Sequence, residues 1–323
     1  MKKILSVVLA IGMMFTLGAF PASASTNDSM DSIEQEMFDY HRMCDETTGN
    51  ILEKYDTLLN GPNDVDYVSL ATSLSMDKSD RIAAMNFITQ IYNTADDAEL
   101  VYLKSYIQSY APYTEEENLH QFCNRLAVEA PYVQVSYNRT DSTNYALDYY
   151  NSINPDYPDL HSLGGDCANF VSQCLFAGGK SMTGDWYIEK LNSNYPAPEN
   201  VTQLDNSWKL ADPSPWISAK EFNNFWSDYA TTFEYKVTEY ETDHRTIYSN
   251  SILGGDVVQL LKPVLWWYEG MHTMIIVGYD VPERDFIYAA HSSDTKDSSI
   301  LGNICNASNG KYDNYHLKFF HIT

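Results

Sequence analysis

Residues 164–179 read Gly-Gly-Asp-Cys-Ala-Asn-Phe-Val-Ser-Gln-Cys-Leu-Phe-Ala-Gly-Gly. The first glycine pair permits a tight turn and a close approach of the backbone to a ligand. The apolar spacing that follows predicts a helix over 166–177, and the second glycine pair predicts its end. The pattern therefore puts Cys167 at the exposed tip of a helix whose later residues pack into a core.

This predicted position suits a cysteine nucleophile. The free amide groups and the dipole at a helix N-terminus favour negative charge, so they lower the pKa of a thiol. The same amides can hold the oxyanion that forms when an amide carbonyl is attacked. We interpret Cys167 as a nucleophile rather than a buried small hydrophobe, because the glycines mark a surface turn. Cys174, seven residues on, is interpreted as a packed structural thiol.

A thiol nucleophile needs a base, and two histidines stand at the ends of predicted strands. His272 opens one apolar run, and His291 ends the next. The residues between these runs, 280–285, read as a hairpin loop. Two antiparallel strands would bring both histidines to one end of the hairpin.

We predict a triad of the Cys-His-His type from these residues. Cys167 is the nucleophile, His272 is the base, and His291 orients the base. Asp294 is the competing third member. For Asp166, the expected role is to cap the turn or the start of the helix, and orientation of a nearby group is the alternative.

The chain divides near residue 130. Over 31–130, apolar residues recur at helical spacing, and we find no catalytic constellation there. After Pro131, strands alternate with irregular aromatic segments. The predicted class is therefore α+β, an antiparallel sheet preceded by helices. The predicted domains are a helical domain over 25–130 and a catalytic domain over 131–323. Strands are expected at 132–136, 256–261, 273–279 and 286–290, and a further helix at 144–152.

The N-terminus predicts export. Lys2 and Lys3 precede an apolar run over 4–20, and a small-residue cleavage site ends at Ala24, so 1–24 is expected to be a signal peptide. No later stretch is apolar for long enough to cross a membrane. We expect a secreted protein with no membrane contact after cleavage, and association with the cell wall is the alternative left open.

The net charge and the lack of several motifs argue against nucleic-acid binding, metal sites and a serine hydrolase. The formal net charge is −24, which argues against a nucleic-acid partner because no basic footprint is present. The chain has five cysteines, an odd number, and no CxxC or HExxH motif, so we expect no metal site. No GxSxG motif is present. We expect no metal or organic cofactor.

Several motifs between residue 132 and the C-terminus share a recognisable pattern. They are Asn138-Arg139, Asn154-Pro155-x-Tyr157, residues 165–175, Ala177-Gly178-Gly179, Ser207-Trp208 ahead of Trp216 and Phe222, and Gly255-Asp256-Val257-Val258 ahead of His272. Together they resemble the bacterial putative amidase domain family. That family is similar to the papain-like group that includes CHAP and NlpC/P60 cell-wall hydrolases.

The resemblance implies a papain-like, NlpC/P60-type fold. It also implies Cys167 as nucleophile, His272 as base and a polar third residue on the next strand, which His291 matches best. The papain pattern has a glutamine ahead of the nucleophile, whereas His161 stands six residues before Cys167 here.

The function we expect is an exported cysteine-dependent amidase or peptidase. Its substrate is an amide bond in a peptide, with cell-wall peptidoglycan the favoured source. Two alternatives stay open: a catalytically inactive cell-wall-binding module on the same scaffold, or an adhesion role of the helical half. Trp186, Trp208 and Trp216 line a groove or fill the core. The oligomeric state is left open.

Overall fold

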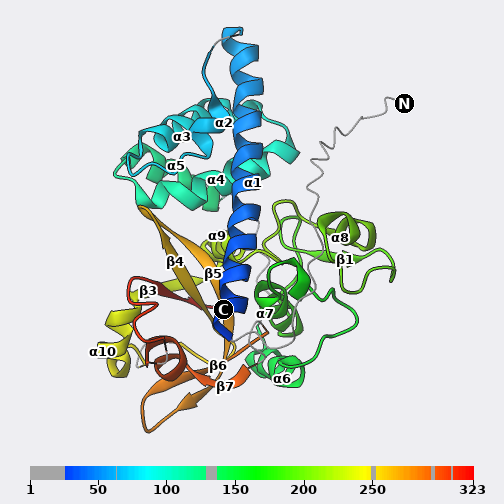
Figure 1. Cartoon of the computed structure of the whole chain (residues 1–323), viewed down its shortest axis with the longest axis vertical. Coiled ribbons are helices and arrows are strands. Elements are labelled where there is room, and N and C mark those ends of the chain that lie inside the picture. Colours follow the sequence, from blue (N-terminus) through cyan, green and yellow to red (C-terminus); the bar gives the residue numbers. More distant parts are fainter. Residues whose placement is uncertain (1–25, 63, 129–136, 249–251, 292–294, 307) are drawn as a thin grey trace.

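The computed structural model of the chain describes residues 26–323 except 63, 129–136, 249–251, 292–294 and 307. The predicted signal peptide, the predicted strand at 132–136 and Asp294 lie outside the described residues. Within them, a helical region is followed by an antiparallel sheet with helices on both faces (Figure 1). This arrangement confirms the α+β class.

The helical region begins with one long helix. Gly61, at φ +77°, follows it and supports a turn. The Asp96 carboxylate accepts a hydrogen bond from the Glu99 backbone amide, and the Glu99 carboxylate accepts one from the Asp96 backbone amide. The fourth helix therefore starts with a capping box. The helices are α1 (Thr26–Asn60), α2 (Tyr67–Ala71), α3 (Ser79–Ile91), α4 (Asp97–Tyr110) and α5 (Glu117–Val128).

Six antiparallel strands form the main sheet, in the order β3-β8-β4-β5-β6-β7. Three of them fall on the predicted runs, although β5 begins earlier than expected. The strands are β3 (Thr231–Lys236), β4 (Val257–Val264), β5 (Trp267–Asp280), β6 (Asp285–Ala290), β7 (Thr295–Ser299) and β8 (His316–His321). A small separate ribbon pairs β1 (Ile188–Lys190) with β2 (Trp208–Leu210).

Five further α-helices surround the sheet (Figure 1). Asn138 caps the first of them by accepting from the amides of Thr140 and Asp141, so this helix starts earlier than residue 144. The helices are α6 (Arg139–Tyr149), α7 (Cys167–Ala177), α8 (Val201–Ser207), α9 (Ala219–Tyr229) and α10 (Val237–Ile247).

Each face of the sheet has its own hydrophobic core. Helices α7 and α9 share one core with Ile275 of β5 and Ala289 of β6. Helix α10 shares the other with Leu260 of β4 and Met274 of β5. Because side chains alternate along a strand, these two sets identify which strand residues face α7.

The tip of the β4–β5 hairpin belongs to the core of the helical region. Trp267 is buried there among residues of α1, α3 and α4. Its ring lies edge-on to Tyr110 at 5.2 Å, and the guanidinium of Arg81 stands 4.6 Å from its centre. Figure 1 shows the hairpin reaching up to these helices.

Buried charges join the same two regions. On α1, His41 Nδ1 lies 3.0 Å from Glu269 Oε2 of β5, and Asp45 receives both Arg81 at 3.0 Å and Lys220 of α9 at 3.5 Å. Burial opposes ionisation of Glu269, but its His41 partner lowers the pKa of that carboxyl to about 2. Glu269 therefore keeps its charge in the interior.

Two of the sequence motifs meet at the sheet. Asp256 accepts from Arg139 at 2.6 Å and lies 2.9 Å from His321 Nδ1, and it also accepts from the amide of Ile322 at 3.0 Å. The contacts tie the start of α6, the start of β4 and the end of the chain together. The Asn138-Arg139 and Gly255-Asp256 motifs are thus explained by structure rather than chemistry.

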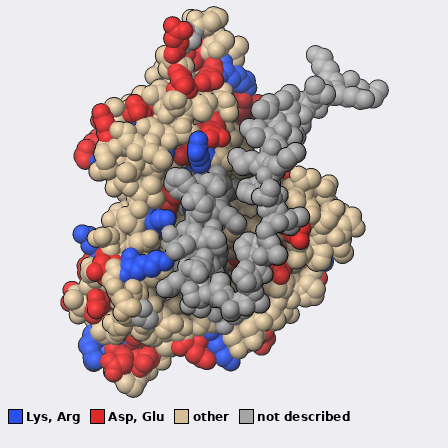
Figure 2. Space-filling model, viewed as in Figure 1, with Lys and Arg blue, Asp and Glu red and all other residues tan. Residues whose placement is uncertain are grey.

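The visible surface is richer in acidic than in basic side chains. Figure 2 shows acidic side chains spread over one face of the molecule, with few basic ones between them. All five cysteines lie among the described residues and stand as thiols, without a disulfide. None of the helices in the described ranges has a long enough apolar stretch to span a bilayer.

Candidate active site

The nucleophile candidate opens α7. Gly164 and Gly165 have φ values of +93° and +124°, a conformation that side chains disfavour, so the turn before the helix requires glycine. Cys167 follows as the first residue of α7, as predicted, but it is only 4% exposed, so the expectation of an exposed helix tip was wrong. Phe170 and Cys174 anchor the helix in the core, as expected, and burial raises the pKa of the Cys174 thiol well above its usual range.

Asp166 does not cap the helix with its side chain, although it does accept a hydrogen bond within the preceding turn, the other role expected for it. Its buried carboxylate accepts instead from the Asn169 side-chain amide at 2.7 Å and the Leu160 backbone amide at 3.2 Å. The remaining oxygen lies 2.6 Å from His291 Nδ1. This carboxylate therefore connects the nucleophile's turn to the end of β6, a role that sequence reasoning missed.

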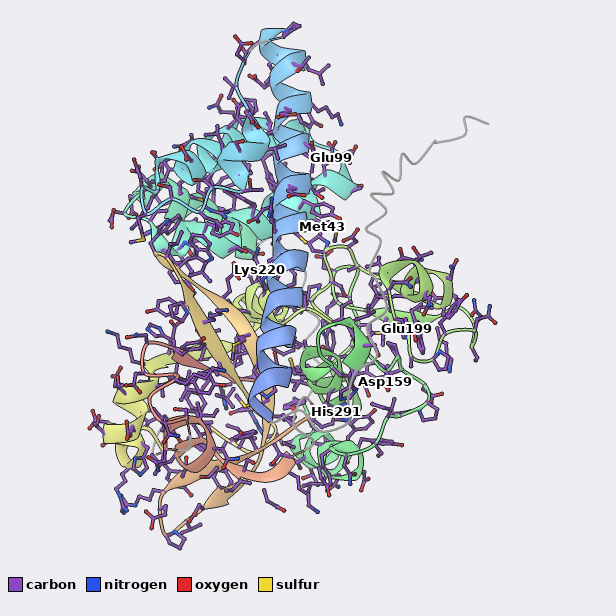
Figure 3. The ribbon with its side chains drawn as sticks, in the orientation of Figure 1. Met43, Glu99, Asp159, Glu199, Lys220 and His291 are labelled. Atoms are coloured by element: carbon purple, nitrogen blue, oxygen red, sulfur yellow. The ribbon has the colours of Figure 1, made fainter. Side chains whose placement is uncertain are left out.

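His291 lies at the same end of α7 as Cys167. Its ring stacks on Phe170 with 4.1 Å between centroids, and its Nε2 lies 2.6 Å from the Tyr149 carbonyl oxygen. Figure 3 shows the residue beside the α6 and α7 helices. Both ring nitrogens of His291 thus lie within hydrogen-bond distance of oxygen atoms, which fixes the orientation of the ring.

His272 lies on the other face of the sheet. Strands β5 and β6 pair as predicted. Ile275 pairs with Ala289, so His291 lies at the level of Thr273, one residue away from His272. His272 pairs instead with Leu260, whose side chain is in the core of α10. Cross-strand partners share a face, so the two histidines point to opposite faces.

Burial sets the protonation state of His272. Its side chain is 9% exposed, and desolvation lowers its pKa to about 4. It is therefore neutral at pH 7, as a base must be, but with weak basicity.

A third histidine stands near the turn. His161 Nδ1 lies 2.7 Å from Asp159, and its Nε2 is 3.3 Å from the His291 carbonyl oxygen. Burial opposes its charged form, but the hydrogen bond with Asp159 and the field of Asp166 raise the pKa of His161 above its ordinary value. Its side chain is 42% exposed, more than that of His291.

The tryptophans build the support of the helix. The core around α7 buries Trp186, Trp208 and Trp216. Of the two alternatives left open by the sequence, these tryptophans fill the core and do not line a groove. Trp216 donates to Asn169 at 3.0 Å, and its carbonyl accepts from Ser172 at 3.1 Å. Across the described ranges, no three His, Cys, Asp or Glu side chains converge as metal ligands.

Comparison with known proteins identifies the region. The family model described as "Putative amidase domain" matches residues 136–317, more than half of the chain. An uncharacterized protein of Bacillus subtilis (strain 168), YhbB, is 34% identical over 65 residues, which are 18% of this chain and 20% of that relative. The chain thus spans about a fifth of that relative's length. No solved structure matches, so the papain-like fold stays a prediction.

Proposed function

The chain belongs to the putative amidase domain family, and from that premise we propose that it is a cysteine-dependent amide hydrolase with Cys167 as its nucleophile. The family supports an amide substrate. One observation carries the cysteine assignment: Cys167 opens α7 directly after Asp166, which holds His291 at 2.6 Å. The Cys167 thiol, the His291 imidazole and the amides at the start of α7 thereby lie at one helix end.

In the proposed reaction, the thiolate of Cys167 attacks the amide carbonyl carbon. The amides at the start of α7 stabilise the oxyanion, and an imidazolium gives its proton to the leaving amine. Water then cleaves the thioester, which releases a carboxylic acid and restores the thiol. We assign the proton transfer to His291, because it lies on the α7 side of the sheet, with Asp166 as its orienting partner.

His272 is the competing base. It was predicted from the sequence, and it lies at the same end of the β5–β6 hairpin. The pairing of His272 with Leu260 and its low pKa count against it.

The proposed substrate is an amide in a peptide outside the cytoplasm, with peptidoglycan as the favoured source. The signal sequence expected over 1–24 supports that setting, and so does the sequence resemblance to cell-wall hydrolases.

One set of observations favours the alternative, an inactive binding module. Cys167 is 4% exposed, and both nitrogens of His291 already contact acceptors. In an inactive module, these contacts would keep Cys167 and His291 from reacting.

The first test is alkylation of Cys167 by iodoacetamide across pH, read on its own peptide by mass spectrometry. Wild type, His291→Ala and His272→Ala are compared, and the Cys174 peptide is the internal control. We expect fast labelling well below pH 8.5, the usual thiol pKa, that is lost in His291→Ala and kept in His272→Ala.

The opposite pattern would assign the base to His272. Slow labelling in all three proteins would favour the binding module. Where labelling is fast, peptidoglycan fragments are the first substrates to try, and Cys167→Ala is expected to abolish their turnover.

A further inference from the structure

The side chain of Asn169 joins three segments of the chain at the start of α7. It is fully buried, and it belongs to the first turn of the helix that Cys167 opens. Its Nδ2 donates to Asp166 Oδ1 at 2.7 Å and to the Pro158 carbonyl oxygen at 2.9 Å, and its Oδ1 accepts from Trp216 Nε1 at 3.0 Å. The amide thus uses both of its N–H groups and its oxygen.

These partners allow only one orientation of the Asn169 amide. The indole nitrogen of Trp216 can only donate, and the carbonyl oxygen of Pro158 can only accept. A flipped amide would set its N–H groups against the indole N–H and its oxygen against two other oxygens. The N–H groups of Asn169 are therefore held toward the Asp166 carboxylate.

The Asp166 carboxylate is turned away from the helix that it precedes. An aspartate at this position ordinarily accepts hydrogen bonds from the backbone amides of the first turn. Among the described residues of α7, none donates such a bond to Asp166. Its Oδ1 accepts instead from the Asn169 side chain and from the Leu160 amide, and its Oδ2 lies 2.6 Å from His291 Nδ1. Asn169 and Leu160 thus take one oxygen and leave the other to the imidazole.

The direction of this carboxylate matters for the adjoining thiol. A carboxylate that capped α7 would occupy the backbone amides that the proposed reaction uses for the oxyanion. Its negative charge would also weaken the effect by which a helix N-terminus activates a thiol. The hydrogen bond from the Asn169 side chain opposes both outcomes, because it engages the carboxylate away from those amides.

We propose that Asn169 is a positioning residue, which withdraws the Asp166 carboxylate from the start of α7 and directs its second oxygen at His291. The inference rests on the proposed function, in which Cys167 reacts and His291 transfers the proton. Asn169 takes no part in the reaction itself and acts only through Asp166. Trp216 supports this role by fixing the orientation of the amide.

Alkylation of Cys167 by iodoacetamide across pH tests this role in the full chain, with melting temperatures as the check on folding. Asn169→Leu keeps the size of the side chain and removes both N–H groups. Trp216→Phe keeps an aromatic ring and removes the indole N–H, and it carries the test if Asn169→Leu does not fold. Ser172→Ala is the matched control, because Ser172 lies on the same helix and donates to the Trp216 carbonyl at 3.1 Å without contacting the carboxylate.

We expect Asn169→Leu to move the labelling profile to higher pH. At pH 7 it should slow labelling by about tenfold, which is the change that a thiol pKa one unit higher produces. Trp216→Phe should give a smaller loss in the same direction, and Ser172→Ala should follow wild type.

A second comparison separates positioning from packing. Asp166→Asn keeps the shape of that side chain and removes its charge. If Asn169 acts through Asp166, adding Asn169→Leu to Asp166→Asn should slow labelling by less than about twofold, since the two changes are then not additive. A packing defect would instead slow labelling equally in both backgrounds.

Unchanged profiles in Asn169→Leu and Trp216→Phe, or an equal loss in the Asp166→Asn background, would overturn the positioning role. Fast wild-type labelling that is lost in His291→Ala but kept in Asn169→Leu would refute that role alone. Failure of the proposed function has a different signature. Wild-type Cys167 would then label as slowly as the Cys174 peptide, or His291→Ala would label as fast as wild type, and the positioning role would fall with it.

Discussion

Asp166 Oδ2 and His291 Nδ1 lie 2.6 Å apart, although the residues are 125 positions apart in the sequence. Both side chains are almost fully buried. The pair joins the turn before α7 to the end of β6, so the position of Cys167 relative to the sheet depends on it. Removing one partner of such a pair leaves an uncompensated buried charge.

Asp166→Ala should therefore lower the free energy of unfolding by about 3–5 kcal/mol. Chemical denaturation of wild type and variant measures the difference. The matched control is Asp159→Ala, because the Asp159–His161 pair is partly exposed and should contribute about 1 kcal/mol or less. Equal losses in the two variants would contradict a stabilising buried pair.

His272 should make stability depend on pH. Its folded pKa of about 4 lies below the value of about 6.5 expected in the unfolded chain. Its contribution is therefore complete above pH 6.5 and is lost as the pH falls toward 4. Between pH 7 and 4.5, wild type should lose about 2–3 kcal/mol relative to His272→Gln. Parallel stability curves for the two proteins would show that His272 is not buried and neutral.

Trp267→Ala should destabilise the helical region and the sheet region together. The ring is buried in the helical core but belongs to β5, and loss of such a side chain costs about 3–5 kcal/mol. Far-UV circular dichroism and tryptophan fluorescence should follow one common unfolding transition in wild type and variant. Two separate transitions in wild type would mean that the regions fold independently.

Gly270→Ala should be poorly tolerated. A Cβ at this position would lie 2.4 Å from the Ala219 carbonyl oxygen, at the start of α9. Overpacking against backbone costs about 1–3 kcal/mol. Gly278→Ala on the same strand is the control, because its Cβ would meet nothing closer than 3.7 Å. Similar melting temperatures for the two variants would refute the close approach of β5 and α9.

Local patterns predicted much of the fold correctly. Glycine pairs and apolar spacing gave α7 over 166–177, and the 280–285 loop gave the β5–β6 hairpin. Sequence analysis did not find β3, β7 or β8. Those strands alternate weakly or carry charged residues, such as Glu234 and Lys318, which pair with each other only across the sheet.

The site was harder to predict than the fold, because a strand's face depends on register. An offset of one residue between β5 and β6 separates His272 from His291, and nothing in either strand alone fixes that offset. The partnership of Asp166 with His291 is likewise long-range. The only local signal was an acidic residue directly before the cysteine, which capping explained equally well.

The burial of Trp267 in the helical core also affects the order in which the chain can fold during synthesis. Synthesis proceeds from the N-terminus, so α1 to α5 emerge long before the hairpin tip that completes their core. The core of these helices therefore lacks Trp267 until most of the remaining chain has been synthesised. Such a chain stays competent for translocation across a membrane for longer than a chain whose N-terminal domain folds alone.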